Sequence, residues 1–258
     1  MSLSNPQIKN PSTRFMQWRG GADGGGRITY YDKADEQEYE VDLPFRFTVL
    51  DELHTITGFS EKDHSGFWSN EVRDLKDKLV VKTKTGTIAQ GAYGDISDRI
   101  KALGAKYAKS VYIAFKDESG ELVIGNIKFS GASLTAWIEF EKKFDVSVAA
   151  VGITGGKKAK KGATIYFTPI IEGLNLNEQT KKEAVKLDEE LQRYLNTYMA
   201  QKPKADDVVE DDDDDEPTTV ADEPVTEDDD DEEEAEAPAP KKKAVAKKTE
   251  INVQDVEF

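Results

Sequence analysis

The last fifth of this chain limits what the protein can fold into. Between residues 206 and 236, twenty of thirty-one residues are Asp or Glu, and few side chains there could join a hydrophobic core. A segment with so much charge and so little apolar surface is predicted to stay disordered, so we expect a disordered acidic tail over 202–258. The core must then come from roughly the first 200 residues, enough for one sizeable domain.

The charge of the chain is divided unevenly. Residues 205–258 hold 5 of the 35 Lys and Arg but 23 of the 51 Asp and Glu, which leaves 30 basic and 28 acidic side chains in residues 1–204. The formal net charge of −16 therefore arises in the tail. Such asymmetry is typical of an interaction tail on a body whose basic residues can gather in a patch.

Rare residue types exclude several kinds of site. The chain has no cysteine and only two histidines, His54 and His64, which excludes disulfides and thiolate metal sites and argues against a structural zinc. We expect no metal and no cofactor. The chain also lacks an apolar signal segment and any run of about 18 apolar residues, which predicts a cytoplasmic protein with no membrane partner.

The body is predicted to be mainly β with inserted helices. Proline and glycine oppose regular structure in residues 1–27, which we interpret as an extended lead-in. Residues 28–176 hold strand-like stretches with helices between them, which indicates an OB-fold-like β-barrel with additions. Residues 177–201 form a C-terminal helix whose apolar stripe can dock on the sheet or on a second copy, so a homodimer is one of two alternatives. Strands are expected at 27–31, 38–41, 45–56, 78–85, 110–116, 121–129, 144–153 and 164–171, and inserted helices at 95–103 and 133–143.

No catalytic motif is recognisable. Gly156-Lys157 resembles the end of a phosphate-binding loop, but Val151 stands where the first glycine is required and Lys158 where Ser or Thr is required. Neither histidine has the partners of a catalytic triad at a usable spacing. We therefore expect a protein that is not an enzyme. A magnesium-dependent nuclease or phosphoesterase built on body carboxylates is an alternative.

Lysines form two groups that could contact phosphates. In a strand over 76–85 the even-numbered positions share one face, and a lysine face suits the backbone of a single nucleic-acid strand. The segment 154–162 is predicted to be a flexible basic loop between two strands, placed to close over a bound chain. An ordinary solvent face and a solubilising hairpin tip are the alternative interpretations. The candidates are Lys76, Lys78, Lys82 and Lys84 on the strand, Lys157, Lys158, Lys160 and Lys161 in the loop, and Arg46 between two phenylalanines.

Aromatic side chains outside the main apolar rows are candidates for base stacking. A ring stacked on a base contributes about 1–3 kcal/mol. Each ring alone is more typical of packing, but together with the lysines they favour binding of single-stranded nucleic acid. These rings alternate with core residues, lie in a polar stretch or stand between glycines: Tyr112, Tyr166, Phe67, Trp68 and Tyr93.

The tail ends at Asp255-Val256-Glu257-Phe258, so a lone aromatic ring follows a run of acids. The tail carboxylates would compete with phosphates for the lysines of the body. Nucleic acid in the groove would then release the tip to a partner pocket with a basic rim. A lysine patch over Lys241–Lys248 interrupts the acids before the tip.

The tip, and the body from Asp42-Leu43-Pro44-Phe45-Arg46-Phe47 through Glu172, resemble the single-stranded DNA-binding proteins of tailed bacteriophages. The resemblance implies an OB-fold barrel that coats single-stranded DNA in phage replication and recombination, in the host cytoplasm, without reading its sequence. It also implies recruitment of replication proteins such as DNA polymerase or helicase through the tail. The alternative is a non-enzymatic acidic chaperone or DNA mimic that acts through its tail. Residue by residue, the resemblance carries over to Asp255, Val256, Glu257 and Phe258.

Overall fold

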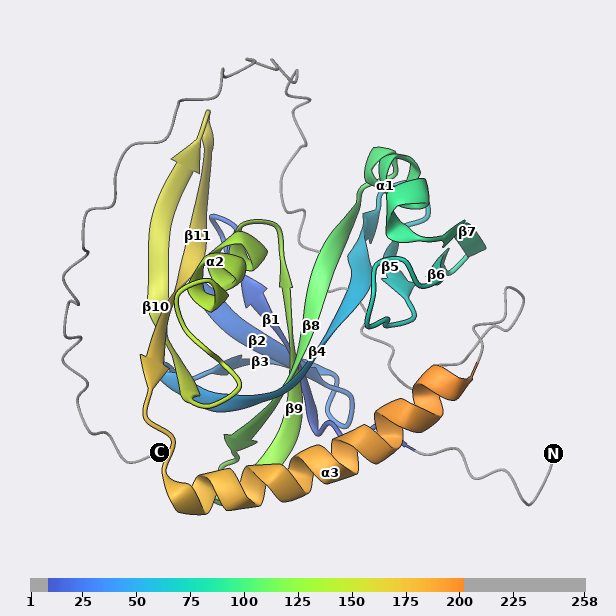
Figure 1. Cartoon of the computed structure of the whole chain (residues 1–258). Helices are drawn as coiled ribbons and strands as arrows, with labels where there is room; N and C mark the ends of the chain where they lie inside the picture. Colours follow the sequence, from blue (N-terminus) through green and yellow to red (C-terminus); the bar gives the residue numbers. More distant parts are fainter. Residues whose placement is uncertain (1–8, 202–258) are drawn as a thin grey trace, which may run out of the picture.

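The computed structural model describes residues 9–201 and is mainly β (Figure 1). The tail over 202–258, with its tip and lysine patch, lies outside the described residues. The predictions of a mainly β body with inserted helices and of a C-terminal helix are confirmed. The helices are α1 (Tyr93–Ala102), α2 (Gly131–Glu141) and α3 (Glu178–Ala200). The strands are β1 (Arg14–Arg19), β2 (Arg27–Asp32), β3 (Gln37–Val41), β4 (Phe45–Ser60), β5 (Ser65–Ser69), β6 (Leu79–Thr83), β7 (Gly86–Gly91), β8 (Ala105–Lys116), β9 (Leu122–Ser130), β10 (Ala150–Lys161) and β11 (Thr164–Leu174).

The strands follow the order β3-β2-β1-β9-β8-β4-β5-β6-β7, and the hairpin β10–β11 branches from this sheet at β4. Strand β4 is 16 residues long and pairs with β10 near its start, with β8 along most of its length and with β5 at its end. The sheet is open and is not closed into the expected barrel. The chain after β1 approaches β11 through a bridge between Gly21 and Tyr166 and a hydrogen bond from the Phe167 N–H to the Gly20 carbonyl.

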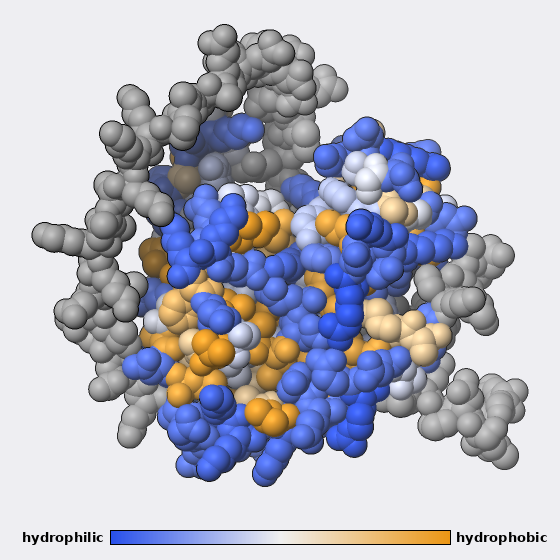
Figure 2. Space-filling view, in the orientation of Figure 1, coloured by the Kyte–Doolittle hydropathy of each residue, from blue (hydrophilic) through white to orange (hydrophobic). Residues whose placement is uncertain are grey.

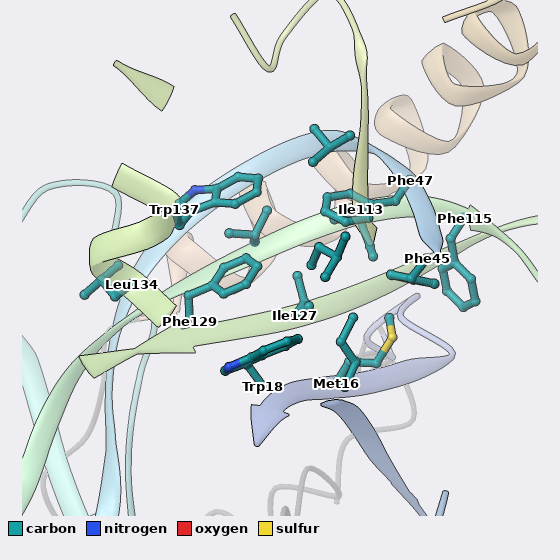
Figure 3. Close-up of a cluster of buried hydrophobic side chains, with 14 residues drawn as sticks. Met16, Trp18, Phe45, Phe47, Ile113, Phe115, Ile127, Phe129, Leu134 and Trp137 are labelled. Carbon is teal, nitrogen blue, oxygen red and sulfur yellow. The ribbon is translucent and has the colours of Figure 1, made fainter. Parts of the chain in front are cut away.

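The main core lies between the sheet, the root of β10 and helix α2 (Figure 3). Trp137 of α2 is fully buried, and its ring stacks on Phe129 at 4.8 Å and on Phe47 at 6.3 Å. Burying a large aromatic side chain contributes about 1.5–3 kcal/mol. Trp137 therefore anchors α2 on the sheet, because its ring meets two strands at once.

Strand β1 lies within the segment expected to be an extended lead-in, and that expectation is wrong for residues 14–19. Met16 and Trp18 are buried in the main core, and β1 runs parallel to β9 with Met16 opposite Ile127. Of the glycines that follow the strand, Gly26 serves close packing. Its φ is +79°, and a Cβ there would stand 2.8 Å from the Cβ of Phe167 and 3.1 Å from the Cα of Gly156.

Helix α3 packs along the outer side of the sheet, as its apolar stripe predicts (Figure 1). Leu191 and Leu195 are fully buried against Leu53, Tyr112 and Ile124. The stripe is thus covered by the protein's own sheet, which is the first of the two predicted alternatives. The homodimer stays a prediction.

Candidate nucleic-acid interface

Two projections rise on either side of the face formed by β4 and β8 (Figure 1). The hairpin arm, residues 154–168, is the part of β10–β11 beyond the pairing of β10 with β4, which ends at Ile153. The insertion arm, residues 61–104, joins β4 to β8 and contains β5, β6, β7 and α1. The candidate site residues fall on these arms or near the face between them, with the exceptions given below.

The hairpin arm corrects the prediction of a flexible basic loop over 154–162. Strand β10 continues to Lys161, and the turn is confined to Gly162 and Ala163. Two of the glycines that suggested a loop lie in the ladder, where Gly155 follows a register shift and a Cβ at Gly156 would stand 3.0 Å from the Cα of Gly26. The basic residues are therefore held on a two-stranded ribbon.

Because side chains alternate along a strand, the four exposed lysines of this arm are divided between its two faces. Lys158 is opposite Phe167, which packs against the main core, and Lys160 lies further out on the same face. Lysines two positions apart are about 7 Å apart along the strand. On the opposite face, Lys157 and Lys161 lie on either side of Ala159, whose cross-strand partner is the half-buried Tyr166.

The insertion arm brings together Trp68 and Lys82, which the sequence had placed in a loop and on a separate strand. They are cross-strand partners on β5 and β6, and Trp68 is 39% exposed. Phe67, in contrast, is buried beside Leu79 in the core of this arm, so it is not the exposed ring that was expected. The arm thus presents one ring with one lysine next to it.

The lysine face expected over 76–85 is not formed. Strand β6 begins at Leu79 and ends at Thr83, so Lys82 is the candidate lysine within it. Lys76 lies in a turn in which its N–H donates to Asp74 Oδ1, and Lys78 precedes the strand. Lys84 lies in the turn to β7, and its Nζ donates to the His64 carbonyl at 3.4 Å.

Of the remaining candidates, Tyr112 is a correction. It is buried beneath α3, its hydroxyl donates to Glu71 Oε2 at 2.7 Å, and burial followed by the Glu71 charge raises its pKa well above the ordinary value. A ring in this position cannot stack on a base. Arg46 is half-buried on β4 opposite Gly152, and Tyr93 is half-buried at the start of α1.

The face between the arms carries side chains that the sequence analysis did not single out. His54 of β4 is directly opposite Lys109 of β8, and Tyr107 is the next residue of β8 on that side. The Tyr107 hydroxyl and His54 Nδ1 are 2.7 Å apart, and the Tyr93 ring is 5.3 Å from the Tyr107 ring. We call Tyr93, Tyr107 and His54 the aromatic row. The alternation of polar residues at every second position of both strands was the sequence signal that could have identified this face.

Next to the aromatic row, Lys109 is held by two carboxylates, a group that we call the acidic clasp. Its Nζ lies 2.8 Å from Glu52 Oε2 and 2.7 Å from Glu141 Oε1, while Trp137 Nε1 donates to Glu52 Oε1 at 2.8 Å. Burial and then the hydrogen bond with Glu52 raise the pKa of Glu141. Burial, and then the charge of Lys109, lower the pKa of His54. Burial raises the pKa of Tyr107 to about 12.

The surface differs between the α1 end and the α2 side of the molecule. Figure 2 shows hydrophilic residues over α1 and hydrophobic residues gathered over α2 and the segment after it. Ile138 and Val148 are exposed there, by 36% and 62%. Within residues 9–201, no cluster of three or more metal-ligating side chains occurs, and no helix of that range is long and apolar enough to cross a membrane.

No protein-family model, curated protein or solved structure matches this chain. Its function must therefore follow from the residues of the site, which are two arms that each join a ring to lysine, an aromatic row, and an acidic clasp.

Proposed function

We propose that this protein binds single-stranded DNA without reading its sequence, along the two arms and the face between them. The observation that carries the proposal is the combination of a ring with lysine on each arm. Trp68 lies beside Lys82 on one arm, and Tyr166 lies near Lys157 and Lys161 on the other. Proteins that bind single strands use rings to stack on bases and a basic groove to follow the backbone, which is what these pairs provide.

We also propose that the strands follow the OB-fold arrangement, with β1 to β3, the insertion arm and α3 as additions. Strands β4, β8 and β9 form an antiparallel meander, α2 follows, and the hairpin β10–β11 returns to pair with β4. In OB folds the loop after the first strand and the loop between the last two strands contact oligonucleotides. Here those positions are the insertion arm and the tip of the hairpin arm, which supports the same ligand class.

The proposed role is to coat exposed single strands in phage DNA replication and recombination. In this proposal the acidic tail competes with DNA for the lysines of the arms, and the tip at Phe258 recruits a replication protein such as a polymerase or helicase. Carboxylates and phosphates compete for the same ammonium groups, so release of the tail would accompany DNA binding. We expect the acidic tail to contact the exposed lysines of the hairpin arm first.

A titration of labelled oligo-dT with the full chain at several salt concentrations tests the proposal. We expect tight binding at low salt and much weaker binding to duplex DNA. Replacing the four lysines of the hairpin arm by Gln should reduce the slope of log K against log salt by up to about 3, at roughly 0.7 per phosphate contact. The matched control replaces four exposed lysines elsewhere, Lys142, Lys143, Lys181 and Lys182.

Two outcomes would count against this function. If the wild-type chain does not bind oligo-dT even at low salt, the proposal fails. If the control quadruple variant loses as much slope as the hairpin-arm variant, the binding is a general charge effect and the arms are not the site. Capture of a basic protein by the tail, without DNA binding by the chain, would favour the acidic chaperone or DNA mimic.

A further inference from the structure

We propose that the aromatic row is a subsite for the bases of the bound strand, while the lysines of the two arms hold its phosphates. This inference rests on the proposed function, because it assigns a part of the same ligand to residues that the proposal for the arms does not use. In this inference the bases of the strand face Tyr93, Tyr107 and His54, on the sheet between α1 and α2.

The aromatic row lies between α1 and α2. Tyr107 and His54 project from neighbouring strands of the sheet, and Tyr93 stands at the start of α1 with its ring tilted by 51° against Tyr107. On the other side, Glu141 of α2 contacts Lys109, the cross-strand partner of His54. The row therefore lies between the two helices, at the base of the insertion arm.

Hydrogen bonding supports the same subsite. Tyr107 keeps its proton at neutral pH, since its pKa is raised to about 12, and its hydroxyl can donate to His54 Nδ1 over 2.7 Å. Neutral imidazole carries one proton, so with Tyr107 as the donor the proton of His54 is on Nε2. An Nε2–H group beside half-buried rings is suited to the carbonyl or ring nitrogen of a base.

The charge beside the aromatic row disfavours a phosphate there. Lys109 is the ammonium group next to the row, and it is already held by Glu52 and Glu141. With both carboxylates ionised, the acidic clasp has a net charge of one negative unit, so a phosphate placed against it would be repelled. The exposed lysines of the hairpin arm attract the same phosphate. A strand crossing from arm to arm is therefore expected to turn its bases, not its backbone, toward the row.

The competing explanation is that the row is a polar packing cluster that fills the space between α1 and the sheet. The two explanations differ in what removal of a ring does to the ligand. A base contact is lost for an ordinary oligonucleotide but not for one that lacks bases. A packing role would change both alike, because it would act through the positions of the arms.

The test compares oligo-dT with an abasic oligonucleotide of the same length, using the full chain. Tyr93→Leu keeps most of the packing volume and removes the ring, and we expect about tenfold weaker binding of oligo-dT. His54→Gln should weaken it less, through the lost Nε2–H donor. Both variants should bind the abasic strand as the wild type does and keep the wild-type salt slope, because they remove no phosphate contact.

Lys158→Gln is the matched control on the hairpin arm, and it should weaken both oligonucleotides and reduce the salt slope. Thermal unfolding checks that each variant is folded, and Tyr107→Phe, which retains the ring, serves as a milder probe of the His54 proton. If the row variants bind both strands like the wild type, or weaken both equally with an altered slope, the inference is overturned while the proposed function stands. If the wild type binds neither strand, the proposed function itself has failed.

Discussion

The two arms stand on opposite sides of the same face but are stabilised differently. The insertion arm has a buried core, in which Leu79, Val81 and Phe67 of the small strands pack against Ile96 and Ile100 of α1, and which continues into β4 and β8 at the base of the arm. No residue of the hairpin arm, 154–168, is buried. The nearest buried residues lie at its root, Ile153 on β10 and Pro169 on β11. An isolated two-stranded hairpin is at best marginally stable in water. The hairpin arm therefore depends on its root, whereas the insertion arm depends on its interior.

For the proposed function, this difference would give the arms different roles. An arm with a buried core holds Trp68 at a fixed place, which would suit the stacking of its ring on a base. A ribbon without a core could adjust the positions of its lysines to the phosphates of a flexible strand.

Leu79→Ala should produce the largest loss of stability. Leu79 is fully buried in the core of the insertion arm, and truncation of a buried leucine costs about 2–5 kcal/mol. The matched change in the hairpin arm, Ile165→Ala, should cost less than about 1 kcal/mol because this side chain is half-exposed near the tip. Urea denaturation followed by circular dichroism measures both. Similar losses in the two arms would contradict the comparison.

Gly26→Ala should loosen the root of the hairpin arm. A Cβ there would meet Phe167 and the backbone of Gly156, so we expect a loss of about 1–3 kcal/mol from overpacking, beyond the cost of the positive φ. Gly25→Ala is the control, since Gly25 also has a positive φ of +63° but open space around it. Hydrogen exchange should quicken in β10 and β11 for Gly26→Ala alone. Equal behaviour of the two variants would show that this contact does not hold the arm.

Trp68→Ala should separate binding from stability. Because Trp68 is 39% exposed, its loss should change stability by less than about 1 kcal/mol while weakening oligo-dT binding by about 1–3 kcal/mol. Tyr39 is an equally exposed ring, at 37%, on β3 at the far end of the sheet. Tyr39→Ala should leave the affinity unchanged. A fluorescence anisotropy titration compares the two variants, and an equal loss of affinity would remove Trp68 from the site.

The sequence predicted the strands that pair with a neighbour in the chain, and the elements whose periodic pattern extends over many residues. The hairpins β2–β3 and β8–β9, the long strand β4 and the stripe of α3 all follow from local patterns. Strand β1 did not, because the prolines and glycines around it suggested irregular structure, whereas pairing with β2 on one side and with the distant β9 on the other makes residues 14–19 a strand. The glycines and lysines of residues 154–162 predict a loop after the strand expected over 144–153, yet pairing with β11 extends β10 from Ala150 to Lys161.

The candidate site was predictable in composition but not in arrangement. Lysines and rings were identified by type, and the exposed Trp68 and the half-buried Lys82 proved to be neighbours. Tyr112 was wrongly predicted to be available for stacking. Strand alternation indicates that its side chain lies on a second face of the sheet, but it does not show that α3 covers this face. The pairing of His54 with Tyr107 depends on the register of β4 against β8 across 53 positions, which no local pattern contains.

The smallest expected effect concerns the face between the arms and its dependence on pH. The pKa of Glu141 is raised above its ordinary value of 4.5, so the folded protein holds this proton more tightly than the unfolded chain does. The stability that this group contributes is complete below pH 4.5 and is lost as the pH rises through the raised pKa. Glu141→Gln removes the dependence, so its Tm should increase relative to the wild type between pH 4 and 7, by a few degrees at most. Lys142 is the next residue and is exposed, so Lys142→Gln is the control with a flat difference over the same range. If the difference for Glu141→Gln is equally flat, or falls as the pH rises, then ionisation of Glu141 beside Glu52 and Lys109 does not lower the stability. The acidic clasp would then no longer account for the expected repulsion of phosphates from this face.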